Sequence, residues 1–173
     1  MSFIEGLIEE LRASAPMTRK LLERVPADKL DWKPGAKAMT LGQLAFHIAT
    51  IPGVVSGMIQ NDVDITGMDF VPPVPESYEQ IAEAFEQNLA DAEQRLRAFS
   101  DARLAENWKV KKGDDVMMEM PVSVALRNIL FNHLYHHRGQ LATYFRCLGV
   151  PVPAVFGTSA DENPFAESAA AAG

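Results

Sequence analysis

Apolar residues recur at intervals of three and four in four separate segments of the chain, and this spacing constrains the fold more than any other feature of the sequence. Such intervals place side chains on one face of an α-helix, whereas strict alternation would indicate a β-strand. The segments span about residues 4–25, 41–60, 78–99 and 122–148. We therefore expect four long helices, each of which buries one apolar face.

Capping and stop signals support these helix boundaries. Thr40 precedes Gln43 by three residues, and Ser77 precedes Gln80 in the same way, so both pairs match the capping box that opens a helix. Gly149 and Pro151 are expected to end the last helix near Leu148. Pro16 interrupts the first helical pattern and predicts either a kinked helix or two short ones, whereas Pro52 predicts a kink in the second helix.

The segments between the helices differ in character. Residues 26–40 and 61–75 are rich in Pro, Gly and Asp and are expected to be loops. Residues 107–122 alternate polar and apolar side chains on both sides of a KGDD turn, which indicates a β-hairpin or an extended excursion. The predicted fold class is all-α, a four-helix bundle with this short excursion between helices three and four. We expect one domain over residues 1–165 and a flexible tail over 166–173.

Charge and cysteine content exclude several classes of protein. A net charge of −7 argues against nucleic acid as a partner, because the phosphate backbone selects for basic surfaces. A single cysteine, Cys147, excludes an internal disulfide and a cysteine-rich zinc site. No apolar run reaches the roughly 20 residues that span a bilayer, and the acidic start MSFIEGLIEELR is unlike a signal peptide. We expect a cytoplasmic protein with no membrane partner.

Three of the four histidines lie in the stretch NHLYHHRGQL. At about 100° per residue, His133 and His137 fall within the apolar stripe of the last helix, whereas His136 lies about 100° away from His137. Residues four apart on a helix have Cβ atoms about 5–6 Å apart, a span that two imidazoles can close around one metal ion. His136 is expected at the surface or behind a metal ligand.

The fourth histidine, His47, lies at the edge of the second stripe, close enough to turn inward. His47, His133 and His137 would together supply three nitrogen ligands and leave coordination positions for water or substrate. The alternative is that these histidines only hydrogen-bond within the core. The glutamate of an HExxH motif is missing, since Leu134 follows His133, and Cys147 is expected to be a small core residue.

Two stretches resemble a known family. HLYHHRGQLATYFRCLGVPVP (His133–Pro153), followed by FGTSADE (Phe156–Glu162), resembles the C-terminal signature of the DinB/YfiT-like family of metal-binding four-helix bundles. LDWKPGAKAMTLGQLAFHIA (Leu30–Ala49) resembles its aromatic-x-Pro loop and the helix with its first histidine. The resemblance implies a divalent metal, zinc or nickel, bound by His47, His133 and His137. It also implies a homodimer, and it gives Arg138, Gly139 and Gln140 no defined role.

The resemblance leaves the reaction open. Some relatives use the metal to activate a low-molecular-weight thiol such as mycothiol or bacillithiol, for transfer or isomerisation, and this thiol-dependent activity is our first hypothesis. A hydrolase with metal-activated water is a close variant, weakened by the lack of an identifiable base. The alternative from another class is a metal-binding stress-response protein without catalysis.

Overall fold

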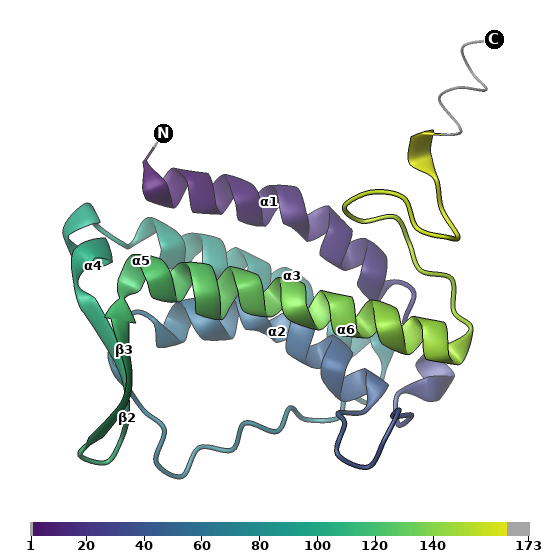
Figure 1. Cartoon of the computed structure of the whole chain (residues 1–173), viewed down its shortest axis with the longest axis horizontal. Coiled ribbons are helices and arrows are strands. Elements are labelled where there is room, and N and C mark those ends of the chain that lie inside the picture. The colour runs from purple at the N-terminus through teal and green to yellow at the C-terminus, as the bar shows by residue number, and fades with distance from the viewer. Residues whose placement is uncertain (1, 166–173) are drawn as a thin grey trace.

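The computed structural model of the chain describes residues 2–165, and these residues are mostly helical with a small three-stranded sheet. Three long helices and one composite helical run lie side by side, with the sheet at one end and the C-terminal loop at the other (Figure 1). The helical elements are α1 (Phe3–Leu22), the short 3₁₀ helix η1 (Ala27–Lys29) within the predicted loop 26–40, α2 (Leu41–Met58), α3 (Tyr78–Arg97), α4 (Asp101–Ala105), and the run α5 (Val122–Ala125), η2 (Leu126–Asn132) and α6 (His133–Leu148).

The predicted capping signals do form. Thr40 and Gln43 make a complete capping box at the start of α2, with each side chain bonded to the other residue's backbone. At the start of α3 the Ser77 hydroxyl accepts from the Gln80 backbone N–H, but the Gln80 side chain accepts from the Glu76 N–H instead. These bonds satisfy backbone donors that have no partner within the helix.

The two helix-interior prolines do not break their helices. Pro16 lies within a continuous α1 and Pro52 within a continuous α2. Between these two alternatives that a proline allows, a kinked single helix and two separate helices, the chain takes the single helix in both cases. Near Pro16 the Ser14 and Thr18 hydroxyls bond to the carbonyls of the preceding turn.

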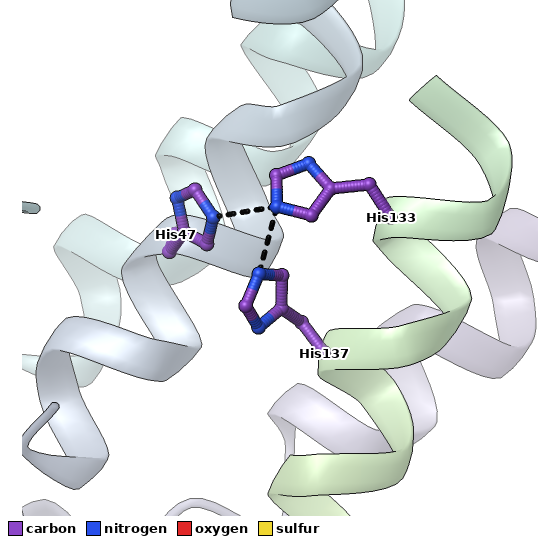
Figure 2. A group of neighbouring side chains, drawn as sticks. All are labelled: His47, His133 and His137. Atoms are coloured by element: carbon purple, nitrogen blue, oxygen red, sulfur yellow. Dashed lines mark hydrogen bonds between the residues drawn. The ribbon is translucent and has the colours of Figure 1, made fainter. Parts of the chain in front are cut away.

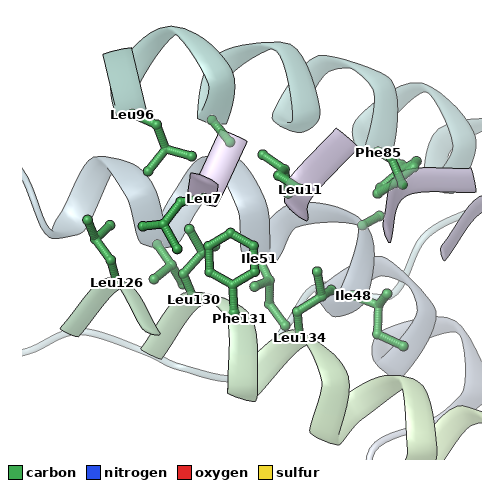
Figure 3. Close-up of a cluster of buried hydrophobic side chains, with 14 of the residues drawn as sticks. Leu7, Leu11, Ile48, Ile51, Phe85, Leu96, Leu126, Leu130, Phe131 and Leu134 are labelled. Carbon is green, nitrogen blue, oxygen red and sulfur yellow. The ribbon is translucent and has the colours of Figure 1, made fainter. Parts of the chain in front are cut away.

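Helices α2 and α3 lie close together at Gly53. A Cβ atom added there would lie 2.3 Å from Asn88 Oδ1, so only glycine permits this approach. The Gly53 carbonyl also accepts from the Arg95 guanidinium of α3. Apolar side chains from all the long helices fill the space between them (Figure 3), and they include Leu7, Leu11, Ile48, Ile51, Phe85, Leu96, Leu126, Leu130, Phe131 and Leu134.

The segment 107–122 is a hairpin, which is one of the two alternatives predicted for it. Strand β2 (Asn107–Lys112) pairs antiparallel with β3 (Asp115–Pro121). The loop prediction for 61–75 needs a correction, because β1 (Val63–Asp64) pairs parallel to β2. The buried Trp108 donates its indole N–H to the carbonyls of Met58 and Asn61, and this contact fixes the sheet at the C-terminal end of α2.

The last helix runs over the predicted residues 122–148 but is not uniform. Its middle section, η2, is a π-helix that ends directly before His133. Gly149 ends α6 with a φ of 70°, a left-handed conformation that glycine adopts without strain. Insertions of π-helical turns are frequent next to functional residues, which directs attention to the start of α6.

Within residues 2–165, only α2 is long and apolar enough to cross a bilayer, and 61% of it is buried inside the protein. A core helix passes the same test, so this finding is weak evidence for a membrane span. The predicted tail, residues 166–173, lies outside the described residues.

Candidate metal centre

The structure brings His47, His133 and His137 together. His47 lies in α2, whereas His133 and His137 occupy the first and second turns of α6, and all three rings point to one place between the helices (Figure 2). Each residue offers a nitrogen, and these nitrogens lie within 4.8 Å of one another. His137 is 8% exposed, and the other two are half-buried.

The nitrogen separations fit a shared ion. His47 Nε2 lies 3.3 Å from His133 Nε2, and His133 Nε2 lies 2.8 Å from His137 Nε2. Two nitrogens that are each about 2.0–2.1 Å from one ion lie about 3.3 Å apart at a tetrahedral angle and about 2.9 Å apart at a right angle. Two of the three nitrogen pairs therefore have separations that suit ligands of one divalent ion, and the third pair lies within 4.8 Å.

Gln140 determines which nitrogen of His137 is free to bind. Its Oε1 lies 2.6 Å from His137 Nδ1, so Nδ1–H donates to this oxygen and the lone pair is left on Nε2. Burial lowers the pKa of His133, the backbone carbonyl of Ile129 acts in the opposite direction, and His133 Nδ1 has no hydrogen-bond partner within residues 2–165. Both rings of α6 thus turn Nδ1 away from the centre and Nε2 toward it.

Each of the three rings is held in a form that can bind a metal ion. His137 Nε2 carries a lone pair, and in the metal-free protein a neutral His133 can donate Nε2–H to it across 2.8 Å, a proton that a bound ion would displace. Burial lowers the pKa of both His133 and His137, so the protonated forms of these rings are disfavoured. Burial also lowers the pKa of His47 to about 4, with His137 and His133 acting in the same direction. The rings are neutral near pH 7, the form in which histidine binds metals.

The fourth histidine and the cysteine lie apart from this centre. His136 is exposed, as predicted, and its ring only packs against the edge of His137. The expectation of a core position for Cys147 is wrong, because this thiol is exposed. The reason is helical geometry: the eleven residues from His136 to Cys147 make about three whole turns, so Cys147 lies on the same outward face of α6 as His136.

Two neighbours in the sequence have environments that sequence reasoning did not assign. Gln140 follows His137 by three residues, and this spacing on a helix could have indicated the contact. Arg138 is 3% exposed, and nothing in the residue pattern indicates that a charged group next to His137 would be buried. Its burial depends on the C-terminal loop, which is folded back over α6.

Comparison of the whole sequence with models of known protein families gives a match over almost all of the chain. The DinB family model covers residues 1–164. The chain belongs to the DinB family. Among curated proteins, it is 26% identical over 160 residues to the uncharacterized protein YrdA of Bacillus subtilis strain 168, with 92% of this chain and 91% of that protein covered.

Solved DinB-like structures show the same fold. A DinB-like protein from Bacillus cereus ATCC 10987 is 27% identical with a TM-score of 0.66, and the match covers 88% of this chain and 97% of that one. A DinB family structure from Exiguobacterium sibiricum 255-15 has the same TM-score, 0.66, at 20% identity, with coverage of 89% and 97%. The predicted family is therefore confirmed. The predicted all-α fold is confirmed only as a mostly helical fold, because the structure also contains a small three-stranded sheet.

Proposed function

We propose that this DinB family protein is a metal-dependent enzyme that uses a low-molecular-weight thiol for group transfer or isomerisation. The observation that carries the proposal is the convergence of three Nε2 atoms from two helices, with Gln140 holding one of them in the metal-binding tautomer. A three-ligand set leaves coordination positions for another molecule, which is typical of catalytic rather than structural sites. Zinc or nickel is the proposed ion.

The proposed metal ion would contribute positive charge to the site. A divalent ion held by three neutral imidazoles keeps its positive charge and lowers the pKa of a bound thiol, so that a nucleophile is available near pH 7. The chain's own residues supply the fixed geometry: α2 and α6 hold the imidazoles, and Gln140 prevents His137 from rotating or exchanging its tautomer. Burial keeps the three imidazoles unprotonated and available as ligands.

The thiol proposal is preferred over hydrolysis because of what surrounds the histidines. Among residues 2–165, no carboxylate hydrogen-bonds to any of the three rings, and the only side-chain partner outside the trio is the Gln140 amide. Hydrolysis requires a base to take a proton from water, whereas a thiol loses its proton far more readily. The reducing cytoplasm keeps thiols reduced, and we propose that the protein acts there.

We also infer that the four packed helical segments are the predicted four-helix bundle and that residues 1–165 form one domain. A bundle builds its sites from side chains on facing helices, and the histidines of α2 and α6 have this relation. The homodimer implied by the family resemblance is a further proposal, which light scattering on the purified protein tests.

Turnover by metal-loaded protein tests the proposed function. Wild type loaded with zinc or nickel is assayed with bacillithiol, mycothiol or glutathione against a chromogenic electrophile. We expect metal-dependent turnover with at least one thiol, a background rate for His137→Ala, and an unchanged rate for the matched surface variant His136→Ala. Tight metal binding without turnover with any thiol would contradict the enzyme and favour a metal-binding protein.

A further inference from the structure

A second concave site lies on the opposite side of α6 from the histidine cluster. The chain that follows α6 turns back toward α1 (Figure 1) and, together with α6 and Leu21 of α1, lines a partly open cavity of about 340 Å³. Its lining is mainly apolar, and it contains Ala142, Val152, Val155 and Phe156. None of the three metal-centre histidines lines it.

A single buried cation borders this cavity. Arg138 is 3% exposed, and its two terminal nitrogens, Nη1 and Nη2, are buried without a hydrogen-bond partner among residues 2–165. The aromatic rings of Tyr135 and Phe156 lie over the guanidinium, with ring centroids 5.4 and 4.8 Å from its Cζ. Ring faces attract a cation, but they do not replace the hydrogen bonds that a guanidinium loses on burial.

The acidic side chains of this region form hydrogen bonds and ion pairs with residues other than Arg138. Glu10 accepts two hydrogen bonds from Arg127 and one from Tyr135 Oη. In the C-terminal loop, Glu162 pairs with Lys20 and Arg24 of the α1 end. Asp161 pairs with Arg146 and accepts from the Val152 backbone N–H. The described residues thus leave the charge of Arg138 without a compensating anion.

Hydrogen bonds of Ser159 hold the C-terminal loop in place beside the cavity, on both sides of its turn. The Ser159 hydroxyl donates to the Val152 carbonyl at 2.6 Å and accepts from the backbone N–H groups of Asp161 and Glu162. Gly157, with a φ of 145°, allows the turn between them. The wall of the cavity is therefore preformed, which reduces the entropic cost of binding a ligand.

Phe156 is the movable part of this wall. Its ring covers Arg138, yet 75% of the residue is exposed to solvent. Rotation of this ring away from Arg138 loses little buried apolar surface, and it uncovers the terminal nitrogens to a molecule in the cavity. A ligand can thus reach the guanidinium without unfolding the loop.

We propose that this cavity binds a small molecule with one carboxylate on an apolar body. A carboxylate accepts two parallel hydrogen bonds from a guanidinium, and its single charge neutralises that of Arg138. A phosphate would carry excess negative charge into an apolar enclosure with no second cation among the lining residues, so we prefer the carboxylate. The apolar body occupies the space beside Ala142, Val152 and Val155.

Calorimetry with chelator-treated protein tests this site separately from the metal centre. Phenylacetate is titrated into wild type, Arg138→Met and Ala142→Leu, the last of which fills the cavity and leaves the guanidinium in place. Arg97→Met is the matched control, because it removes an exposed arginine of α3 that does not line the cavity. Phenylacetamide and inorganic phosphate serve as neutral and doubly charged comparison ligands.

We expect saturable binding of phenylacetate to wild type and Arg97→Met with a Kd below about 1 mM, and binding weaker by at least about tenfold in Arg138→Met and Ala142→Leu. Phenylacetamide should also bind at least about tenfold more weakly. If Arg138→Met does not fold, Ala142→Leu and phenylacetamide decide the question. Equal binding to wild type and the folded variants, no saturable binding up to about 10 mM, or tighter binding of phosphate would overturn the proposal.

Discussion

At the scale of single residues, the candidate metal centre depends on which ring nitrogen of each histidine faces the space between α2 and α6 and which faces away from it. His133 and His137 could be placed on one helix face from their spacing alone, because a four-residue interval is a local property of a helix. The role of Gln140 could not be assigned in the same way, since it depends on the rotamers of two side chains. The burial of Arg138 depends on a loop that follows the helix.

Replacement of Gln140 tests the control of the His137 tautomer. Gln140→Leu removes the acceptor of the Nδ1–H donor, so His137 can exchange to the tautomer whose Nε2 carries a proton. We expect metal affinity to fall about 10–100-fold, as measured by competition with a chelating indicator. The His136→Ala variant should bind like wild type, and an unchanged affinity in Gln140→Leu would contradict the assignment.

Acid should destabilise the metal-free protein through His47. Burial lowers the pKa of His47 from 6.5 to about 4. Between these values the unfolded chain binds a proton that the folded chain does not, so the free energy of unfolding falls as the pH drops from 6.5 to about 4. Urea unfolding of chelator-treated protein measures this, and His47→Leu should give a flatter profile over the same range. The same slope in both proteins would argue against a neutral, buried His47.

At the scale of elements, the long helices follow directly from the apolar spacing, but their local irregularities do not. Spacing at three and four indicates that residues 122–148 are helical without showing that residues 126–132 form a π-helix. The parallel pairing of β1 with β2 joins segments 47 residues apart, from Val63 to Val110, and two residues are too few to produce a pattern. The position of α2, which carries His47, depends on its close approach to α3 at Gly53.

A methyl group at Gly53 should separate α2 from α3. Gly53→Ala places a Cβ atom 2.3 Å from Asn88 Oδ1 and 3.0 Å from the Asn88 Cα, so the Asn88 side chain must move and the two backbones must separate slightly, and we expect a loss of about 1–3 kcal/mol in the free energy of unfolding. The matched control is Gly6→Ala in α1, where no atom lies within 4 Å of the added carbon. This second variant should gain about 0.5–1 kcal/mol from helix propensity. Denaturant unfolding measures both, and equal effects would contradict the close approach.

At the scale of the whole molecule, ion pairs between segments that are distant in the sequence connect α1 to η2 and to the C-terminal loop. Arg127 of η2 pairs with Glu10 of α1, and Glu162 of the C-terminal loop pairs with Lys20 of α1. The third histidine of the candidate metal centre, His47, is 86 residues from His133, so spacing suggested His47 but could not place it beside His133. The family resemblance supplied that pairing, and the geometry agrees with it.

One cooperative unfolding transition should follow if residues 1–165 form a single domain. Trp108 lies at the sheet end of α2, and Trp32 packs edge-on against Tyr144 of α6, so the two indoles report on different regions. We expect the fluorescence of Trp32→Phe and of Trp108→Phe to change at the same denaturant concentration as the helical circular dichroism of the same variant. Separate transitions within either variant would show two independently folding parts.

The metal content of the purified protein tests the central claim most directly. Elemental analysis after loading with zinc or nickel should find about one divalent ion per chain in wild type and in His136→Ala, and almost none in folded His133→Ala. The two variants remove the same side chain three residues apart, one from the centre and one from the surface. Absence of metal from loaded wild type, or equal metal in His133→Ala and His136→Ala, would contradict the account.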